Sequence, residues 1–171
     1  MKKLTGSLLF MVLINCSNAQ SLKKYAIGNS GCSVYTFCNP VFEETYSEDS
    51  SKIFTGECEK DTVYYGVICV KLQTATSNLD VAEELVVSYL DFLKKNFEIA
   101  SAAGYGKGNR LNSNENTRGV IDYWQDKKKN NWKVKGWTDG KFIGIVYVYT
   151  QLEVPESKAN VFLNSFRFPG M

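Results

Sequence analysis

Four cysteines, Cys32, Cys38, Cys58 and Cys69, are the side chains of this sequence with the clearest capacity for chemistry. In an oxidising compartment such a group of thiols forms disulfides, and we expect at least one here, with free thiols as the alternative. A metal site is disfavoured because the cysteines lack the C-x-x-C spacing and the chain contains no histidine, so that only an all-thiolate site would remain. The sequence therefore predicts disulfides, and neither a metal nor a cofactor.

The absence of histidine also limits catalysis. It excludes Ser-His-Asp and Cys-His arrangements, although lysine nucleophiles and pairs of carboxylates remain available. Asp122 and Asp126 are candidates for a pair, because residues four apart on a strand face the same way. Their separation of roughly 13 Å exceeds the about 5 to 10 Å used by glycosidases, so we interpret them as a solvated strand face. We expect a non-catalytic protein, with a histidine-independent hydrolase that uses carboxylates as the alternative.

Ligand binding is the main functional expectation. Lys133, Lys135 and Trp137 alternate along one expected strand, so their side chains share a face. An exposed tryptophan beside lysines can stack on a sugar ring or on a side chain of a protein partner. In the alternative interpretation, Trp137 packs under a helix and the lysines reach around it. The ligand would be an unknown protein, a small molecule or a saccharide.

The glycine-rich segment 102–110 is a second candidate surface, and it contains Tyr105 and Lys107. Its three alternate glycines predict a tight or mobile bend between strands. It lacks the Gly-Lys-Ser/Thr ending of a phosphate loop and the spacing of a dinucleotide fingerprint. The functional alternative to a simple bend is contact between an anion and the backbone amides, assisted by Lys107.

The elements that must position these residues predict an α+β fold, an antiparallel β-sheet covered by a long central helix and a short C-terminal helix. Runs of β-branched and aromatic residues predict strands at 33–37, 52–58, 62–72, 119–126, 132–138 and 141–150, with 41–45 as a further extended piece. Apolar residues at steps of three and four predict a helix over 79–97, capped by Asn78 or Asp80, and a shorter one over 153–166. Because the central strands are apolar on both faces, we expect the long helix on one face and the C-terminal helix, with the N-terminal segment, on the other.

The expected strands restrict disulfide pairing. Cys32 and Cys38 would lie roughly 20 Å apart on one strand, and a tight hairpin places Cys58 opposite Val63 rather than Cys69. Neither adjacent pair then reaches the Cα separation of about 5 to 6 Å that a disulfide needs. We therefore expect links between the first strand and the hairpin, and favour Cys38 with Cys58 and Cys32 with Cys69.

Residues 1–19 have the pattern of a secretory signal peptide, with Lys2 and Lys3, an apolar run over 8–14, and small residues before Gln20. The apolar run is shorter than the roughly 20 residues that span a bilayer, so we expect cleavage and export to the periplasm or the extracellular space. The two lysines account for the formal net charge of +2. The mature chain would then carry no field that attracts nucleic acid or an anionic membrane.

The start of the mature chain leaves two expectations. Cys16 lies in a faint likeness of a lipoprotein cleavage box, so a lipid-anchored envelope component is the alternative to a secreted protein, and membrane contact is expected only in that case. Residues 20–31 contain lysines and glycines and predict a flexible N-terminal arm, which would leave 32–171 as a single α+β domain.

The order of these segments resembles that of the PsbP-like family of α/β/α sandwiches. The similarity rests on the strand 62–72, the helix 79–97, the Asp122-Tyr123-Trp124 motif and the closing segment Phe162-Leu163-Asn164-Ser165-Phe166. It covers most of the mature chain as a pattern of elements, and the four cysteines are not part of it. The resemblance implies a binding or accessory domain more often than an enzyme.

Overall fold

A computed structural model of the chain describes residues 21–171. The predicted signal peptide with its cleavage site, and Cys16, lie outside these residues. Within them the elements are β1 (Lys23–Ala26), β2 (Ser33–Thr36), β3 (Val41–Tyr46), β4 (Lys52–Lys60), β5 (Val63–Lys71), α1 (Leu79–Asn96), β6 (Ile99–Ala102), β7 (Gly106–Asn109), a 3₁₀ turn (Leu111–Ser113), β8 (Arg118–Asp126), β9 (Asn131–Thr138), β10 (Phe142–Thr150) and α2 (Glu156–Leu163).

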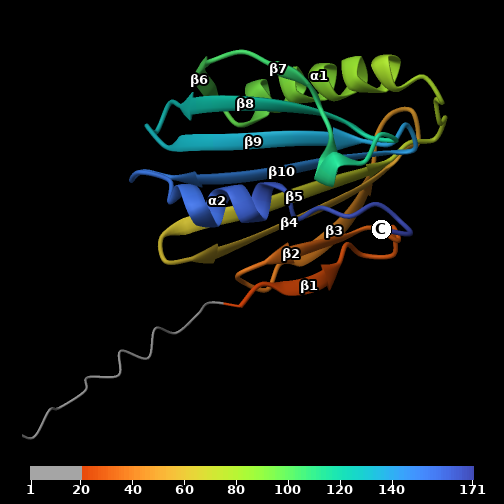
Figure 1. The fold of residues 1–171 in the computed structure, drawn as a ribbon. Helices are drawn as coiled ribbons and strands as arrows, with labels where there is room; N and C mark the ends of the chain where they lie inside the picture. Colours follow the sequence, from red (N-terminus) through yellow and green to blue (C-terminus); the bar gives the residue numbers. More distant parts are fainter. Residues whose placement is uncertain (1–20) are drawn as a thin grey trace, which may run out of the picture.

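An eight-stranded sheet forms the middle layer (Figure 1), in the order β3-β4-β5-β10-β9-β8-β6 with β7 also beside β8. Every pairing in it is antiparallel. The hairpins β3-β4-β5 and β8-β9-β10 follow from short turns, and β10 then pairs with β5 to join the two halves at the centre. Residues 21–171 therefore form the predicted α+β fold, a mostly antiparallel sheet with two helices.

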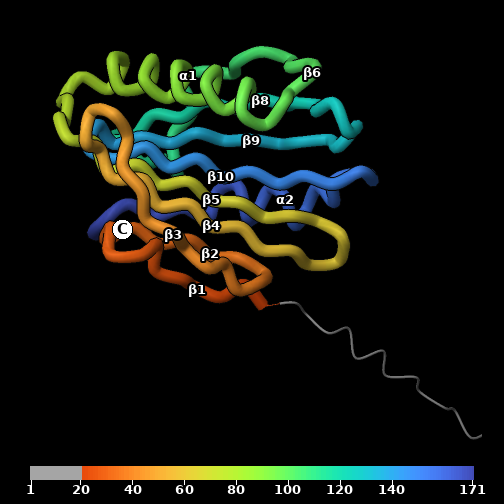
Figure 2. The backbone as a smooth tube through the Cα atoms, turned by 180° about the vertical axis from the view of Figure 1, so that it is seen from behind, coloured from red at the N-terminus to blue at the C-terminus, as the bar shows by residue number. Residues whose placement is uncertain are grey.

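Helix α1 covers one face of the sheet, where it packs on β8 and β9 (Figure 2). Asn78 caps it, as predicted, since its side chain accepts hydrogen bonds from the backbone amides of residues 80 and 81 at 3.0 and 3.2 Å. Leu90 is fully buried on the face that meets the sheet, whereas Leu85 is 42% exposed. The residue beneath the helix is Gly136, where a Cβ would overlap Val86, so glycine permits the close approach. Neither helix of residues 21–171 is long and apolar enough to cross a membrane.

The opposite face is covered by α2 and by both ends of the described chain. β1 and β2 form a two-stranded sheet, and Ile27 after β1 is fully buried in the core of this face. Ser33 also pairs with Arg167 near the C-terminus, through backbone hydrogen bonds of 3.0 and 2.8 Å. The expected flexible arm is therefore wrong for residues 21–31, where strand pairing and burial of Ile27 hold the segment in place.

One disulfide joins the N-terminal hairpin to the sheet, because Cys38 is bonded to Cys58 of β4 with a Cα–Cα distance of 5.9 Å. This confirms half of the favoured pairing. Cys32 and Cys69 are free and buried in the same core, so the second expected bond is not formed in this structure. The adjacent Cys32 and the loss of water both raise the pKa of Cys69, which disfavours its thiolate form.

Candidate functional site

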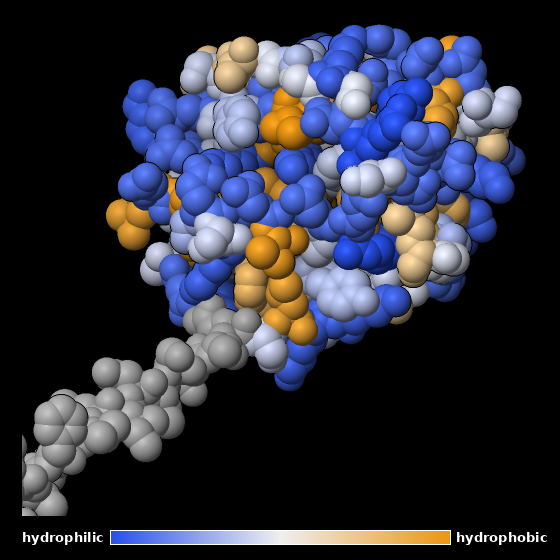
Figure 3. All heavy atoms as spheres, viewed as in Figure 1, coloured by the Kyte–Doolittle hydropathy of each residue, from blue (hydrophilic) through white to orange (hydrophobic). Residues whose placement is uncertain are grey.

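The surface predicted around Lys133, Lys135 and Trp137 is covered by α2. Trp137 is 2% exposed, and its indole Nε1 donates a hydrogen bond to the carbonyl oxygen of Leu163 at 3.0 Å. Both lysines contact side chains at the ends of α2, and Lys135 lies 5.5 Å from the Trp137 ring centre. The outer surface of this face is mostly hydrophilic (Figure 3). The interpretation of Trp137 as an exposed ligand-binding residue is therefore wrong, and the alternative, in which the ring packs under a helix and the lysines reach around it, is confirmed.

The glycine-rich segment is fastened to α1 by acidic side chains of that helix. Lys107 forms an ion pair with Glu84 at 2.7 Å, and the backbone amide of Gly108 donates to a carboxylate oxygen of Glu83 at 2.7 Å. The Tyr105 hydroxyl is held by two further charged side chains of α1. The Gly108 amide and the Lys107 ammonium, which an anion would need, are therefore already bound to carboxylates. The segment is a bend that these contacts hold against the helix.

Asp122 is fully buried and acts as a structural acceptor. It forms an ion pair with Lys94 at 3.0 Å, and it accepts hydrogen bonds from Trp124 Nε1 at 2.6 Å and from the amide of Gly104 at 3.0 Å. Its interpretation as a solvated side chain is wrong. With its oxygens committed to these donors, Asp122 anchors the glycine-rich bend and is not available as an acid or base.

Asp126 is likewise buried, at the turn between β8 and β9. The backbone amide and side-chain amide of Asn130 donate to it at 2.9 and 2.7 Å, and Trp132 Nε1 donates at 3.0 Å. Burial alone would raise the pKa of Asp126, but these hydrogen bonds to the charged form together lower it. Asp126 therefore fixes the turn and the orientation of Trp132, and the proposed solvated face is wrong here too.

A row of aromatic rings crosses the α1 face of the sheet just beyond the end of that helix. Tyr64 of β5, Tyr149 of β10 and Trp132 of β9 are direct cross-strand neighbours. Their rings stack with centroids 4.6 and 4.1 Å apart, and Phe97, directly after α1, stacks on Trp132 at 5.1 Å. The planes of successive rings differ by 5°, 15° and 22°, so the rings stand side by side and form a rigid floor.

A further ring, that of Tyr147 on β10, supports this floor from within the core of the same face. Tyr147 is buried and packs against both Phe97 and Trp132 at 5.4 Å. Its ring lies over β5 at Gly66, where any Cβ would overlap it. The hydroxyls of Tyr147 and Tyr149 donate to the two oxygens of Glu57 at 3.0 and 3.1 Å. Burial, followed by the negative charge of Glu57, raises the pKa of both tyrosines, so they remain neutral donors at neutral pH.

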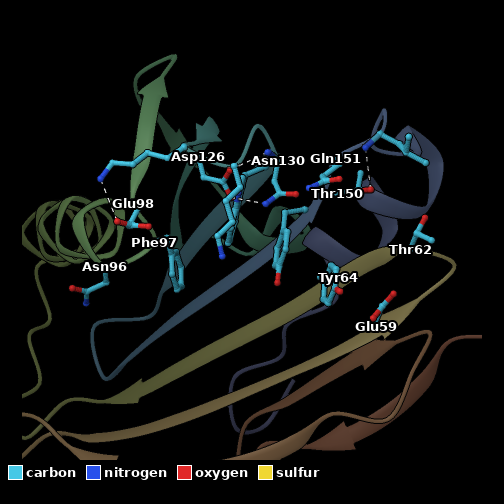
Figure 4. Close-up of a pocket in the computed structure, with 15 residues that line it drawn as sticks. Glu59, Thr62, Tyr64, Asn96, Phe97, Glu98, Asp126, Asn130, Thr150 and Gln151 are labelled. Carbon is cyan, nitrogen blue, oxygen red and sulfur yellow. Dashed lines mark hydrogen bonds and ion pairs between the residues drawn. The ribbon is translucent and has the colours of Figure 1, made fainter.

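The floor lies in an open groove of about 770 Å³ (Figure 4). The ends of α1 and β10 and two hairpin turns form its rim. This volume lies within the range of small-ligand sites. The rim includes Glu59 and Thr62 at the β4–β5 turn, Asn96 and Glu98 at the end of α1, residues 126–130 of the β8–β9 turn, and residues 150–152 after β10. We call this site the aromatic groove.

Some rim side chains are already hydrogen-bonded or ion-paired, and others are free to bind a ligand. Lys127 pairs with Glu98 at 3.2 Å, and a hydrogen bond with Glu59 raises the pKa of Tyr64. Within residues 21–171, no hydrogen bond or ion pair involves the side chains of Asn96, Lys128 and Gln151. These three groups surround the ring floor and can meet an incoming molecule without breaking an existing contact.

This groove was not predicted, because nothing in the sequence indicates that the rings of residues on different strands lie side by side. The usable signals were the alternation of Tyr147 and Tyr149 on one strand and the position of Phe97 at the end of the helix. Trp132 is 7% exposed, and its ring lies in the floor of the groove. The predicted ligand-binding residues Tyr105, Lys107, Lys133, Lys135 and Trp137 all lie outside the aromatic groove, and of the carboxylate pair only Asp126 lines it.

No group of three or more His, Cys, Asp or Glu side chains in the described residues is arranged to hold a metal ion. The groove offers aromatic contact, hydrogen bonds from amides and one free ammonium group, and its buried Asp126 is held by hydrogen bonds within the fold. The sequence matches no family model, and no curated protein is detectably similar to it.

Proposed function

We propose that the protein is an exported, non-catalytic binding domain and that the aromatic groove is its ligand site. The observation that carries the proposal is the ring row of Tyr64, Tyr149, Trp132 and Phe97, fixed by stacking and edged by unpaired polar groups. A rigid floor loses little conformational entropy on binding, which favours affinity. The resemblance to PsbP-like accessory domains agrees with a binding role.

The location is a separate part of the proposal. The Cys38–Cys58 disulfide is typical of oxidising compartments, and the pattern of residues 1–19 is that of a cleaved signal. Intact-mass spectrometry of protein recovered from the periplasm or medium is expected to give a chain that begins at Gln20. A mass that includes a lipid on Cys16 would replace this proposal with an anchored envelope component.

Binding can be tested without knowing the ligand by nuclear magnetic resonance with a mixed library of neutral, acidic, basic and apolar fragments. We expect hits to shift the Trp132 indole resonance and the backbone amides of residues 96, 130 and 151. The variant Asn96→Trp is expected to abolish these shifts by filling the groove, and Asn160→Trp, on the exposed side of α2, is the matched control. Hits that cluster elsewhere, or none in the groove, would refute the proposed site.

A further inference from the structure

The charges around the aromatic groove nearly balance. Lys127 neutralises Glu98, and Glu59 and Lys128 on the rim have opposite sign. The remaining charge is the carboxylate of Asp126, which is buried and held by amide and indole donors. Electrostatic complementarity therefore favours a ligand without a strong net charge.

The free polar groups match hydroxyls better than they match ions. The side-chain amides of Asn96 and Gln151 each carry a donor and an acceptor, and both are unpaired within residues 21–171. A hydroxyl is also both donor and acceptor, so one amide can bind one or two neighbouring hydroxyls.

The floor provides one ring face for an apolar surface. Trp132 and Tyr149 each have stacked neighbours on both sides, whereas Tyr64 stacks on Tyr149 alone among the described aromatic residues. Tyr64 is half-buried, and its other side lies at the Glu59 end of the groove. A ligand with a C–H face and a hydroxyl periphery fits this combination of one open ring and flanking amides.

Building on the proposed function, we infer that the ligand of the aromatic groove is a neutral saccharide of one or two sugar units. The sugar's C–H face packs on Tyr64, and its hydroxyls bind the amide of Gln151 on the same side of the groove, whereas Asn96 lies beyond Phe97 at the other end of the ring row (Figure 4). The groove volume of about 770 Å³ accommodates a ligand of that size. The Gln151 amide contributes a modest hydrogen bond, so the affinity is shared between this bond and the ring contact.

The test is a titration of the oxidised mature chain with maltose, cellobiose, lactose and chitobiose, with glucuronate and glucosamine as charged probes. At least one neutral disaccharide is expected to bind with an affinity that is unchanged between 50 and 500 mM salt, because screening affects only charged pairs. Gln151→Ala is expected to weaken binding by roughly three- to tenfold, and Asn96→Ala, at the other end of the ring row, by less than about threefold. Asn160→Ala and Gln73→Ala, at exposed positions outside the groove, are the matched controls and should bind as the parent does.

Four further variants, one of them a control, separate the effect of ring stacking from that of charge. Tyr64→Val is expected to weaken binding by roughly tenfold, while Tyr123→Val, an exposed tyrosine on β8 outside the groove, leaves it unchanged. Glu59→Gln and Lys128→Gln are expected to change affinity by less than about threefold, since neither charge faces a charged ligand. Circular dichroism of each variant establishes that the fold is retained.

The outcomes distinguish this inference from the proposed function. Binding only of glucuronate or glucosamine, with strong salt dependence and loss in the Lys128 or Glu59 variant, overturns the neutral saccharide and keeps the groove as a site. If fragments bind in the groove but no saccharide does, the neutral saccharide is likewise refuted and the groove remains a binding site. If neither fragments nor sugars reach the groove, the proposed function fails as well.

Discussion

Replacing Gly66 with alanine tests how the aromatic floor is built. A Cβ at this position would overlap the Tyr147 ring, which lies across β5 and donates to Glu57 at 3.0 Å. Overpacking of a core costs about 1–3 kcal/mol, and losing the hydrogen bond costs about 0.5–1.5 kcal/mol more. The lower entropy of the unfolded alanine chain offsets about 0.5–1 kcal/mol. We therefore expect Gly66→Ala to lower the free energy of unfolding by about 2 kcal/mol.

The assay is equilibrium unfolding in urea, followed by tryptophan fluorescence and compared by midpoint and slope. The matching fall in Tm is roughly 4 to 8 °C for a domain of this size. Gly106→Ala is the control, because a Cβ at that strand position finds its nearest atom 3.8 Å away, and it is expected to leave stability unchanged or slightly higher.

A double-mutant cycle assigns the cost to the ring itself. In the background Tyr147→Ala, where the ring is removed, Gly66→Ala is expected to cost nothing further. Equal unfolding free energies for Gly66→Ala and the parent chain would refute the close packing of Tyr147 on β5. A cost that persists unchanged without the ring would assign the effect to the strand backbone instead.

Three other expectations concern Asp122, the disulfide and Tyr149. Asp122→Ala should lower the urea unfolding free energy by about 3 kcal/mol, since it strands Lys94 and an indole donor, and a loss below about 1 kcal/mol would contradict the anchoring role. Replacing Cys38 and Cys58 by serine should cost about 3 kcal/mol, and the oxidised parent should be about 2 Da lighter than the reduced chain; a 4 Da difference would show a second bond. Because the folded-state pKa of Tyr149 lies above its usual value near 10, the unfolded chain loses this proton first, so stability should hold below pH 10 and fall above it. Urea midpoints between pH 7 and 11 measure this, and Tyr149→Phe should show a smaller fall.

The parts of the fold that could be predicted from the sequence are those that local residue patterns specify. The β4–β5 hairpin and the strands β8, β9 and β10 follow from β-branched runs and short turns, and Asn78 caps α1 through contacts within three residues. Strand β1 was missed because Lys23–Ala26 is short and largely exposed. Its pairing with β2 depends on the burial of Ile27 against residues far along the chain, which no local pattern records.

The candidate site could not be predicted, because it arises from register between distant strands. Tyr64 meets Tyr149 only because β5 pairs with β10, and Trp132 joins them through the β9–β10 hairpin. Trp137 illustrates the same limit, since the lysines beside it indicated a polar face. That face is covered by α2, whose position depends on tertiary packing.

The aromatic groove divides stability and binding between different residues, and this division makes the proposed function testable by mutation. The rings of Trp132, Tyr149 and Phe97 pack on one another and on Tyr147 inside the core, so their removal destabilises the fold as well as weakening a ligand contact, whereas Tyr64 lies at the open end of the row. The amides of Asn96 and Gln151 make no hydrogen bond with the rest of residues 21–171, so the fold does not require them. A ligand that binds the native groove also raises the unfolding free energy by RT ln(1 + [L]/Kd), about 2.7 kcal/mol at a hundredfold excess over Kd. Variants of the two amides should therefore match the parent chain in stability without ligand and lose part of this ligand-dependent gain. A variant that is destabilised without ligand would place its amide among the groups that hold the fold.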